Sequence, residues 1–190
     1  MPPKAKFTRE EVVRTALEMV RENGMDTLSA RNLSARLGSS ASPIFTIFQN
    51  MEDVQQEVIS AAHEIYRNYL REDMSGGKYP PYKASGMAYI RFAREEGELF
   101  KLLFMRDRST EAVTEKKEEI APLLELIQTN TGISEEAAYL FHLEMWLYVH
   151  GIAVMIATNY LDWDMEFVDQ VLTDGYMGLK HRYMEENSND

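Results

Sequence analysis

The chain has 190 residues, of which 45% are hydrophobic and 27% charged. This length and composition suffice for one globular domain and a smaller module. It has no cysteine, which excludes disulfides, thiolate nucleophiles and cysteine-ligated metals. Its net charge is -11, but residues 1–50 carry seven Lys and Arg against five acids. A slightly basic head on an acidic body permits contact with a polyanion. No signal peptide is evident, and a cytoplasmic protein is expected.

The first 38 residues predict two helices. Thr8 and Glu11 have the spacing of a capping box, apolar residues recur at three and four after them, and Gly24 supplies a stop. A second, short helix runs from its cap Ser29 to Leu37. Because strand patterns are nearly absent from the whole chain, the sequence predicts an all-α fold.

Residues 39–50 predict a third helix, capped by Ser40, with Pro43 in its first turn. Ile44, Ile47 and Phe48 form an inward stripe at helical spacing. The opposite face is uncharged and has small side chains at its beginning. Such a surface can approach another macromolecule closely.

The remainder predicts a helical body. In chain order the elements are a helix capped by Asn50 and Asp53 and spanning about 51–72, a Gly/Pro-rich linker at 73–82, two helices hinged near Gly97, a charged segment at 106–119, a helix opened by Pro122 and stopped by Gly132, a long apolar helix from Ser134 to Leu161, and a last helix over about 166–183. We therefore expect a head at 1–50 and a body at 51–190, with 51–72 as the connector.

The apolar run 137–161 is long enough to span a membrane, but His142, Glu144 and His150 lie inside it. Neither Lys nor Arg flanks the run, so membrane spanning is not expected. A helix that is apolar on all sides must be covered on all sides in water. In a domain this small, a partner subunit is the natural cover.

Three short helices, with "LGSS" between the second and third, match a helix-turn-helix pattern, although a plain helical corner has the same spacing. From Phe7 to about Val58 the chain resembles the tetracycline-repressor (TetR) family of transcription regulators, through "ENG", "LSARNLSARLGSS" and "PIFTIFQNMEDV". The resemblance implies a three-helix DNA-binding head on an all-α regulatory body, acting as a homodimer on double-stranded operator DNA. Carried over by position, it assigns DNA contacts to Arg31, Ser40, Ala41, Ser42, Pro43, Phe45 and Thr46.

Two positions depart from the family pattern. Phe45 stands where tyrosine is usual, and Met51 stands where a lysine usually opens the fourth helix. Each change removes a phosphate contact, so DNA binding should be weaker and less dependent on salt. Lys4, Lys6 and Arg9 could compensate.

The body resembles a subgroup with Trp-His-Gly in a long C-terminal helix, here within "MWLYVHGIA". A dimer interface is expected at His150, Gly151, Val154 and Leu172. A pocket for a small apolar or aromatic effector is expected at Phe100, Phe104, Met105, Phe141, Met145 and Trp146. The plainer alternatives are that His150 is a hydrogen-bonded core or interface histidine and that the apolar residues form the core.

No nucleophile elbow, phosphate-binding glycine loop or metal-ligand spacing is present, so neither catalysis nor a metal or cofactor is expected. The resulting prediction is a ligand-responsive dimeric transcription regulator, and the family resemblance implies that it is a repressor. The alternative is a TetR-like helical dimer that no longer binds DNA and acts through ligand or protein contacts.

Overall fold

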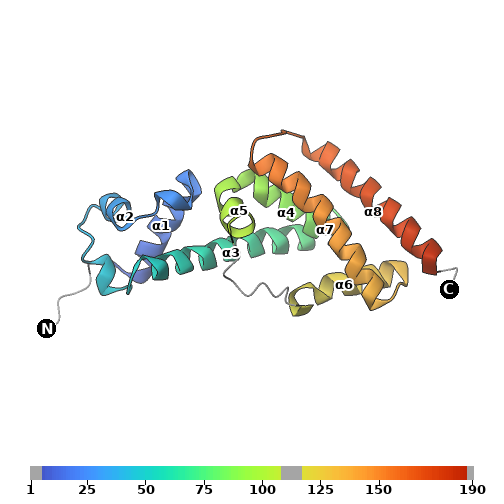
Figure 1. Ribbon diagram of the computed structural model, residues 1–190, viewed down its shortest axis with the longest axis horizontal. Coiled ribbons are helices and arrows are strands. Elements are labelled where there is room, and N and C mark those ends of the chain that lie inside the picture. Colours follow the sequence, from blue (N-terminus) through green and yellow to red (C-terminus); the bar gives the residue numbers. More distant parts are fainter. Residues whose placement is uncertain (1–5, 108–116, 188–190) are drawn as a thin grey trace. The chain divides into compact units, whose positions relative to one another are not determined.

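The computed structural model describes residues 6–107 and 117–187, and these residues form helices without strands (Figure 1). The predicted all-α fold is therefore confirmed. The helices are α1 (Arg9–Asn23), η1 (Met25–Thr27), α2 (Ala30–Arg36), η2 (Ile44–Thr46), α3 (Met51–Ser75), α4 (Pro81–Glu95), α5 (Gly97–Phe104), α6 (Lys117–Thr131), α7 (Glu135–Ala157) and α8 (Met165–Asn187), where η denotes a single 3-10 turn.

Side-chain caps begin four of these helices where the sequence predicts them. Thr8 and Glu11 make both bonds of a capping box on α1. The hydroxyls of Ser29 and Ser134 accept bonds from backbone N–H groups of α2 and α7. At α3, Asn50 Oδ1 accepts from the Asp53 N–H at 2.8 Å. Local hydrogen bonds therefore fix these boundaries.

Other boundaries differ from the prediction. Pro122 lies inside α6 and does not open it, because the helix already begins at Lys117. The long apolar helix α7 ends at Ala157, and Asn159 then takes a positive φ of 54° that turns the chain before Leu161. Helix α3 continues to Ser75, which shortens the linker at 73–82. Most of the charged segment 106–119 lies outside the described residues.

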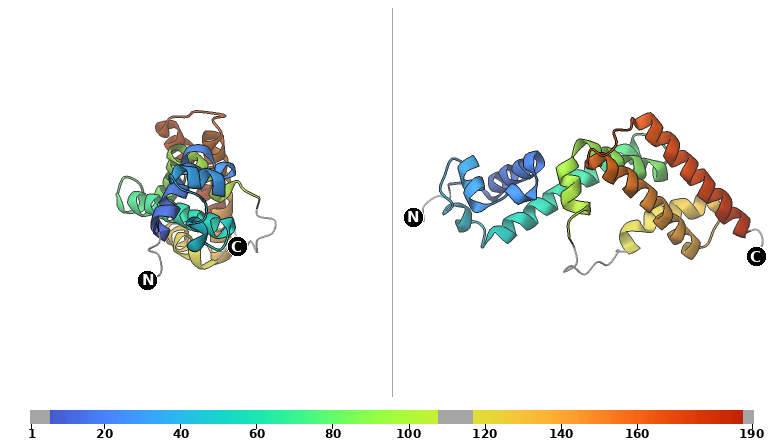
Figure 2. Two further views of the ribbon diagram at one scale, coloured as in Figure 1. Left: turned by 90° about the vertical axis from the view of Figure 1, so that its left-hand side faces the viewer. Right: turned by 45° about the horizontal axis from the view of Figure 1, so that its top comes forward.

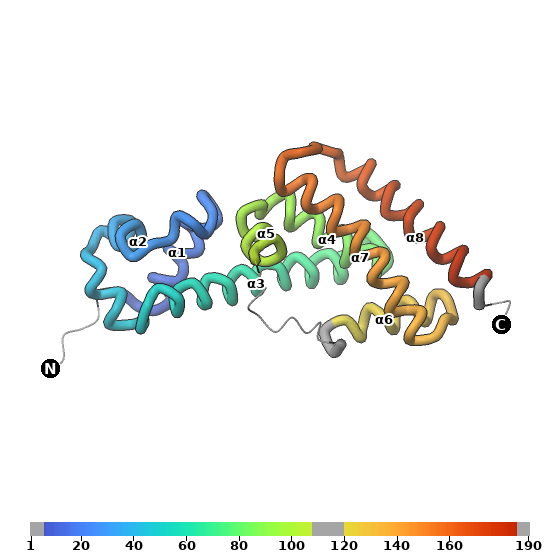
Figure 3. The backbone as a smooth tube through the Cα atoms, in the orientation of Figure 1, coloured from blue at the N-terminus to red at the C-terminus, as the bar shows by residue number. Residues whose placement is uncertain are grey.

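The contacts divide the chain into two compact units. The N-terminal unit comprises residues 1–67 and 96–106, and the C-terminal unit comprises residues 68–95 and 107–190. Helix α3 is continuous along the tube of Figure 3, although its two parts belong to different units. The domain boundary at 50/51 stays a prediction.

The N-terminal unit is built around the inner faces of α1 and α3. Helix α5 also packs against α1, so a segment remote in sequence completes this core. The fully buried side chains include Val12, Val20, Leu33, Ile44, Val54, Val58 and Leu99. Burial of this apolar surface stabilises two helices, α2 and η2, that are too short to persist alone.

The C-terminal unit is a bundle in which α4 packs against α6, α7 and α8. Helices α7 and α8 lie side by side in both Figures 1 and 2, joined by residues 158–164. The core is rich in aromatic and branched side chains, among them Phe92, Ile90, Ile127, Phe141 and Leu172. Among the described residues, no helix covers one face of α7 and α8, where large apolar side chains are exposed.

Candidate nucleic-acid interface

A tight turn connects α2 to the segment that the family resemblance predicts to contact DNA. Gly38 has a φ of +62°, a conformation that strains residues with a side chain. The Ser39 N–H then donates to the Ser34 carbonyl at 2.9 Å and closes the turn. Glycine at this position therefore lets the chain reverse directly after α2.

We call residues 39–50 the reading segment. Its only regular helix is the 3-10 turn η2, so the third α-helix expected after a cap at Ser40 is a wrong prediction. Pro43 stands at the N-cap position and has no N–H, and η2 has no side-chain cap, so the expected cap at Ser40 is also wrong. The N–H groups of Ile47 and Phe48 both donate to the Ile44 carbonyl at 3.0 Å, and these bonds do not continue into a longer helix.

The expected facing of the reading segment is nevertheless found. Ile44 and Phe48 are 0% and 2% exposed, and Ile47 is half-buried. Ser40, Ser42, Phe45, Thr46 and Gln49 are exposed, and Ala41 and Pro43 are partly exposed. The hydroxyl of Thr46 donates to the Pro43 carbonyl at 2.7 Å. The outward face therefore presents small, uncharged groups and one aromatic ring.

Arg9 fastens the end of the reading segment to α3. Its guanidinium lies over the Phe48 ring at 4.4 Å, donates to the Ile47 carbonyl at 3.4 Å and pairs with Glu57. Lys6 Nζ donates to the Ser39 hydroxyl at 3.0 Å. Arg9 is therefore committed to holding the segment in place, which weakens the expectation that it replaces a lost phosphate contact.

Other cations of the head differ in whether they pair with a carboxylate. Arg36 pairs with Glu22 at 2.7 Å, and both side chains are about half exposed. Arg31 is exposed at the beginning of α2 and has no ion pair within the described part of the chain. Arg31 therefore remains available to an external anion. Met51, at the beginning of α3, is partly buried.

A buried carboxylate joins α1 to α5. The Glu96 side chain is 4% exposed and forms a two-pronged ion pair with Arg21, whose side chain is 52% exposed. Glu96 has a non-helical backbone (φ -126°, ψ 47°) at the break between α4 and α5. The hinge expected near Gly97 is present, but sequence inspection gave no sign of its ion pair, because the partners lie 75 residues apart.

The six residues expected to line an effector pocket are distributed over both units. Phe100, Phe104 and Met105 belong to the N-terminal unit, whereas Phe141, Met145 and Trp146 belong to the C-terminal unit. Phe100 and Phe141 are fully buried in the separate cores, and Met105 and Trp146 are about 40% exposed. Within either unit, the structure therefore places at most three of them together.

Two tyrosine–histidine pairs link α4 to α7. The Tyr82 hydroxyl lies 3.2 Å from His142 Nδ1, and the Tyr89 hydroxyl lies 2.9 Å from His150 Nδ1. Trp146 stacks on the His150 ring with centroids 5.0 Å apart. Partial burial lowers the pKa of His150 and so favours the neutral ring. The sequence did not indicate that Tyr82 and Tyr89 are the partners of these histidines.

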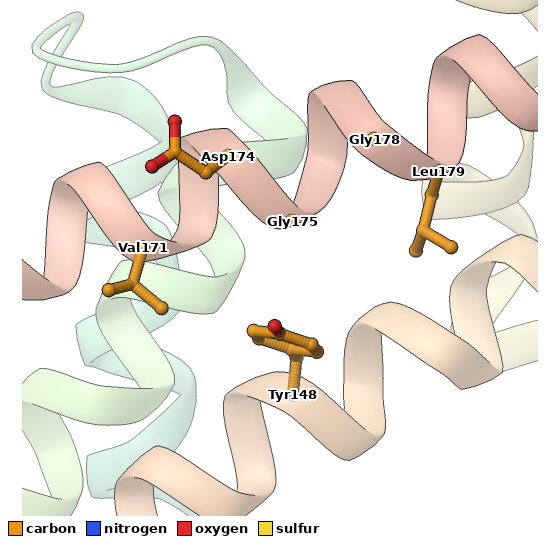
Figure 4. Close-up of a pocket in the computed structure, with 6 residues that line it drawn as sticks. All are labelled: Tyr148, Val171, Asp174, Gly175, Gly178 and Leu179. Carbon is orange, nitrogen blue, oxygen red and sulfur yellow. The ribbon is translucent and has the colours of Figure 1, made fainter.

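The uncovered face of α7 and α8 carries large apolar side chains. Leu147, Tyr148, Phe167 and Met177 are 45–63% exposed. A shallow hollow of about 520 Å³ lies between the helices, lined by Tyr148, Val171, Asp174, Gly175, Gly178 and Leu179. Figure 4 shows Tyr148 projecting from α7 toward α8, between Val171 and Leu179. None of the six predicted effector residues lines it.

The residues expected at a dimer interface lie in this region with different exposures. His150, Gly151 and Val154 are partly exposed on α7, whereas Leu172 is 3% exposed inside the unit. A Cβ added to Gly151 would meet no atom within 4 Å, and the same holds for Gly178 of α8. Glycine inside a helix costs about 1 kcal/mol relative to alanine. The space above both glycines could admit a closely packed helix.

Helix α7 is apolar and long enough to cross a membrane on length and composition alone. Buried positions recur along it, however, and it packs against α4, α6 and α8. Its Glu144 accepts bonds from Arg182 at 2.8 Å and from the Tyr183 hydroxyl at 3.1 Å. These contacts are those of a core helix in a bundle. No group of three His, Asp or Glu side chains in the described ranges is placed to hold a metal ion.

A helical head with an exposed, uncharged reading segment, followed by a helical body, defines the class of helix-turn-helix transcription regulators. Residues 82–175 match the model of the tetracyclin repressor-like C-terminal domain. The chain is also 23% identical over 183 residues to the uncharacterized HTH-type transcriptional regulator Rv0681 of Mycobacterium tuberculosis, covering 88% of this chain and 80% of that protein. The family-model match and this relative together support a TetR-like transcriptional regulator.

Proposed function

We propose that this TetR-like chain is a homodimeric DNA-binding regulator whose reading segment enters the major groove and whose body responds to a small apolar or aromatic effector. The observation that carries the proposal is the facing of the reading segment. Ile44 and Phe48 are buried, so Ser42, Phe45 and Thr46 project outward on an uncharged surface. Side chains of this kind can contact base edges in the groove.

Dimerisation is supported by the uncovered face of α7 and α8. Tyr148 and the hollow beside Gly175 and Gly178 form an apolar surface that a second copy of the same face would bury. To test this, Gly178→Arg would place a long cation over the open space at Gly178. We expect this variant to be monomeric in analytical ultracentrifugation with unchanged helical content. Thr129→Arg, at an exposed position of α6, is the control. A dimeric Gly178→Arg protein would contradict this interface.

Effector binding rests on the body's apolar interior. Phe141 lies among the rings of Tyr82, Tyr176 and Tyr183, and the Tyr82–His142 pair adds a polar group to this cluster. An apolar or aromatic molecule would fit such surroundings. We propose that it changes the population of two conformations that differ in the spacing of the two heads, and that it acts through α3. In this proposal the DNA-bound protein represses nearby genes.

The deciding experiment is a titration of the purified protein with duplexes from beside its own gene, at several salt concentrations. A random-sequence duplex is the control. Selective binding supports the proposal, and its weakening with salt would show that protein cations displace counterions from the phosphates. Absence of selective binding at every salt concentration would refute it.

A second function is favoured by the paired cations of the head. Arg9, Arg21 and Arg36 are all held by carboxylates, Met51 replaces a usual lysine, and the third helix is a single 3-10 turn. These features suit a TetR-like dimer that has lost DNA binding and acts through ligand or protein contacts. Failure of every duplex in the titration, together with retained dimerisation, would support this alternative.

A further inference from the structure

The reading segment contains no charged residue. From Leu37 to Met51 the sequence is "LGSSASPIFTIFQNM", between Arg36 and Glu52. Recognition of guanine through O6 and N7 usually requires arginine or lysine, and recognition of the cytosine amino group usually requires a carboxylate. The segment can supply neither. Its side-chain contacts to bases must come from hydroxyls, the amides of Gln49 and Asn50, and apolar groups.

The hydrogen-bonding capacity at Thr46 is partly used inside the protein. Its hydroxyl donates to the Pro43 carbonyl at 2.7 Å, a bond that fixes the side-chain rotamer. The residue is exposed, so the methyl group is the branch at Cβ that stays unbonded on a surface open to a docked duplex. Thr46 thus offers a methyl group and no free hydroxyl proton to a base.

Phe45 reinforces this apolar character. Its ring is 43% exposed beside Thr46, although Ile44 and Phe48 on either side are buried. The ring has no hydrogen-bonding group and gains nothing from a base edge except by apolar contact. The group in the major groove that offers such contact is the 5-methyl of thymine, which pairs with phenylalanine and threonine methyl groups.

We propose that Phe45 and Thr46 read thymine through its 5-methyl group, so that the operator carries A·T pairs where the reading segment lies. This inference rests on the proposed function, since it requires the segment to enter the major groove. It names the bases that the site selects. Gln49, exposed next to this surface, has an amide of the kind that pairs with adenine.

The test uses the intact protein and a random duplex library. Repeated selection yields a consensus, and each thymine of that consensus is then replaced by 2′-deoxyuridine, which lacks only the methyl group. At one or two positions in each half-site we expect affinity to fall about fourfold, the ratio contributed by one buried methyl group. Thymines elsewhere should tolerate the replacement.

Three variants connect this effect to Thr46. Thr46→Val keeps a methyl group and removes the hydroxyl, so the preference for thymine over uracil should remain. Thr46→Ser keeps the hydroxyl and removes the methyl, so the preference should disappear at one position. Thr158→Ser is the matched control, since Thr158 is also exposed with its hydroxyl bonded to a backbone carbonyl, but lies in the other unit.

The outcomes separate this inference from the function on which it rests. If the library yields no preferred duplex, the proposed DNA-binding function fails and the thymine proposal fails with it. If a consensus emerges but uracil replaces every thymine without loss, only the thymine proposal is overturned. A Thr46→Ser protein with the wild-type preference for thymine would remove Thr46 from the proposal even when the DNA result agrees.

Discussion

Removal of the Arg21 guanidinium should destabilise the N-terminal unit more than removal of its partner, the Glu96 carboxylate. Glu96 is 4% exposed on its side chain, whereas Arg21 is 52% exposed. In Arg21→Met the carboxylate stays buried without its partner, which typically costs about 3–5 kcal/mol. Because water already reaches the Arg21 side of this pair, we expect the lower end, about 3 kcal/mol of unfolding free energy.

The reciprocal variant should behave differently. In Glu96→Met the remaining guanidinium is half exposed and can be hydrated, so we expect a loss of about 1 kcal/mol or less. The double variant removes both charges and should recover most of the stability lost in Arg21→Met, because a buried ion pair and an apolar replacement are often equivalent. Arg36→Met, which breaks the exposed pair with Glu22, is the matched control and should cost about 0–1 kcal/mol.

Urea unfolding followed by two probes provides the assay. Both tryptophans, Trp146 and Trp163, belong to the C-terminal unit, so fluorescence follows that unit alone. Circular dichroism follows the helices of both units. Arg21→Met should shift the dichroism transition to lower urea. Equal losses in Arg21→Met and Glu96→Met, or no rescue in the double variant, would refute the reasoning.

The remaining predictions concern the head and His150. Ile44→Ala deletes three fully buried carbon atoms and should lower the free energy of unfolding by about 2–5 kcal/mol. Thr46→Ala should leave the unfolding followed by circular dichroism near wild type. Equal losses of stability in the two variants would contradict the facing of the reading segment. Met51→Lys should steepen the dependence of log affinity on log salt by about 0.9 in a duplex titration, and an unchanged slope would show that no phosphate lies there. Burial lowers the pKa of His150 below the ordinary 6.5, so the unfolded chain binds the proton first and stability falls as pH drops through that range. His150→Gln should therefore lose less melting temperature than wild type between pH 7.5 and 5.5, and equal losses would assign the effect to other groups.

The sequence specified the helices whose ends depend on local bonds. The hydroxyls of Thr8, Ser29 and Ser134 each accept from a backbone N–H three residues on, so the identities and spacing of these residues suffice to place the start of α1, α2 and α7. The burial of Ile44 and Phe48 was equally predictable from the sequence, because apolar residues spaced three or four positions apart lie on one face of a helical turn. The resemblance to the TetR family rested on short patterns of the same kind in the head.

Tertiary structure decided the features that depend on residues far apart in the chain. The reading segment was expected to be a helix, but beyond the proline only a 3-10 turn forms, and Arg9 secures it through Glu57 of α3, 48 residues away. The Arg21–Glu96 pair and the hollow beside Tyr148 likewise join different helices. Composition cannot indicate which charges meet or which faces stay uncovered, because those depend on how helices pack. Helix boundaries depend on hydrogen bonds within a few residues. The pairing of charges and the exposure of side chains depend on how the helices pack in the folded core.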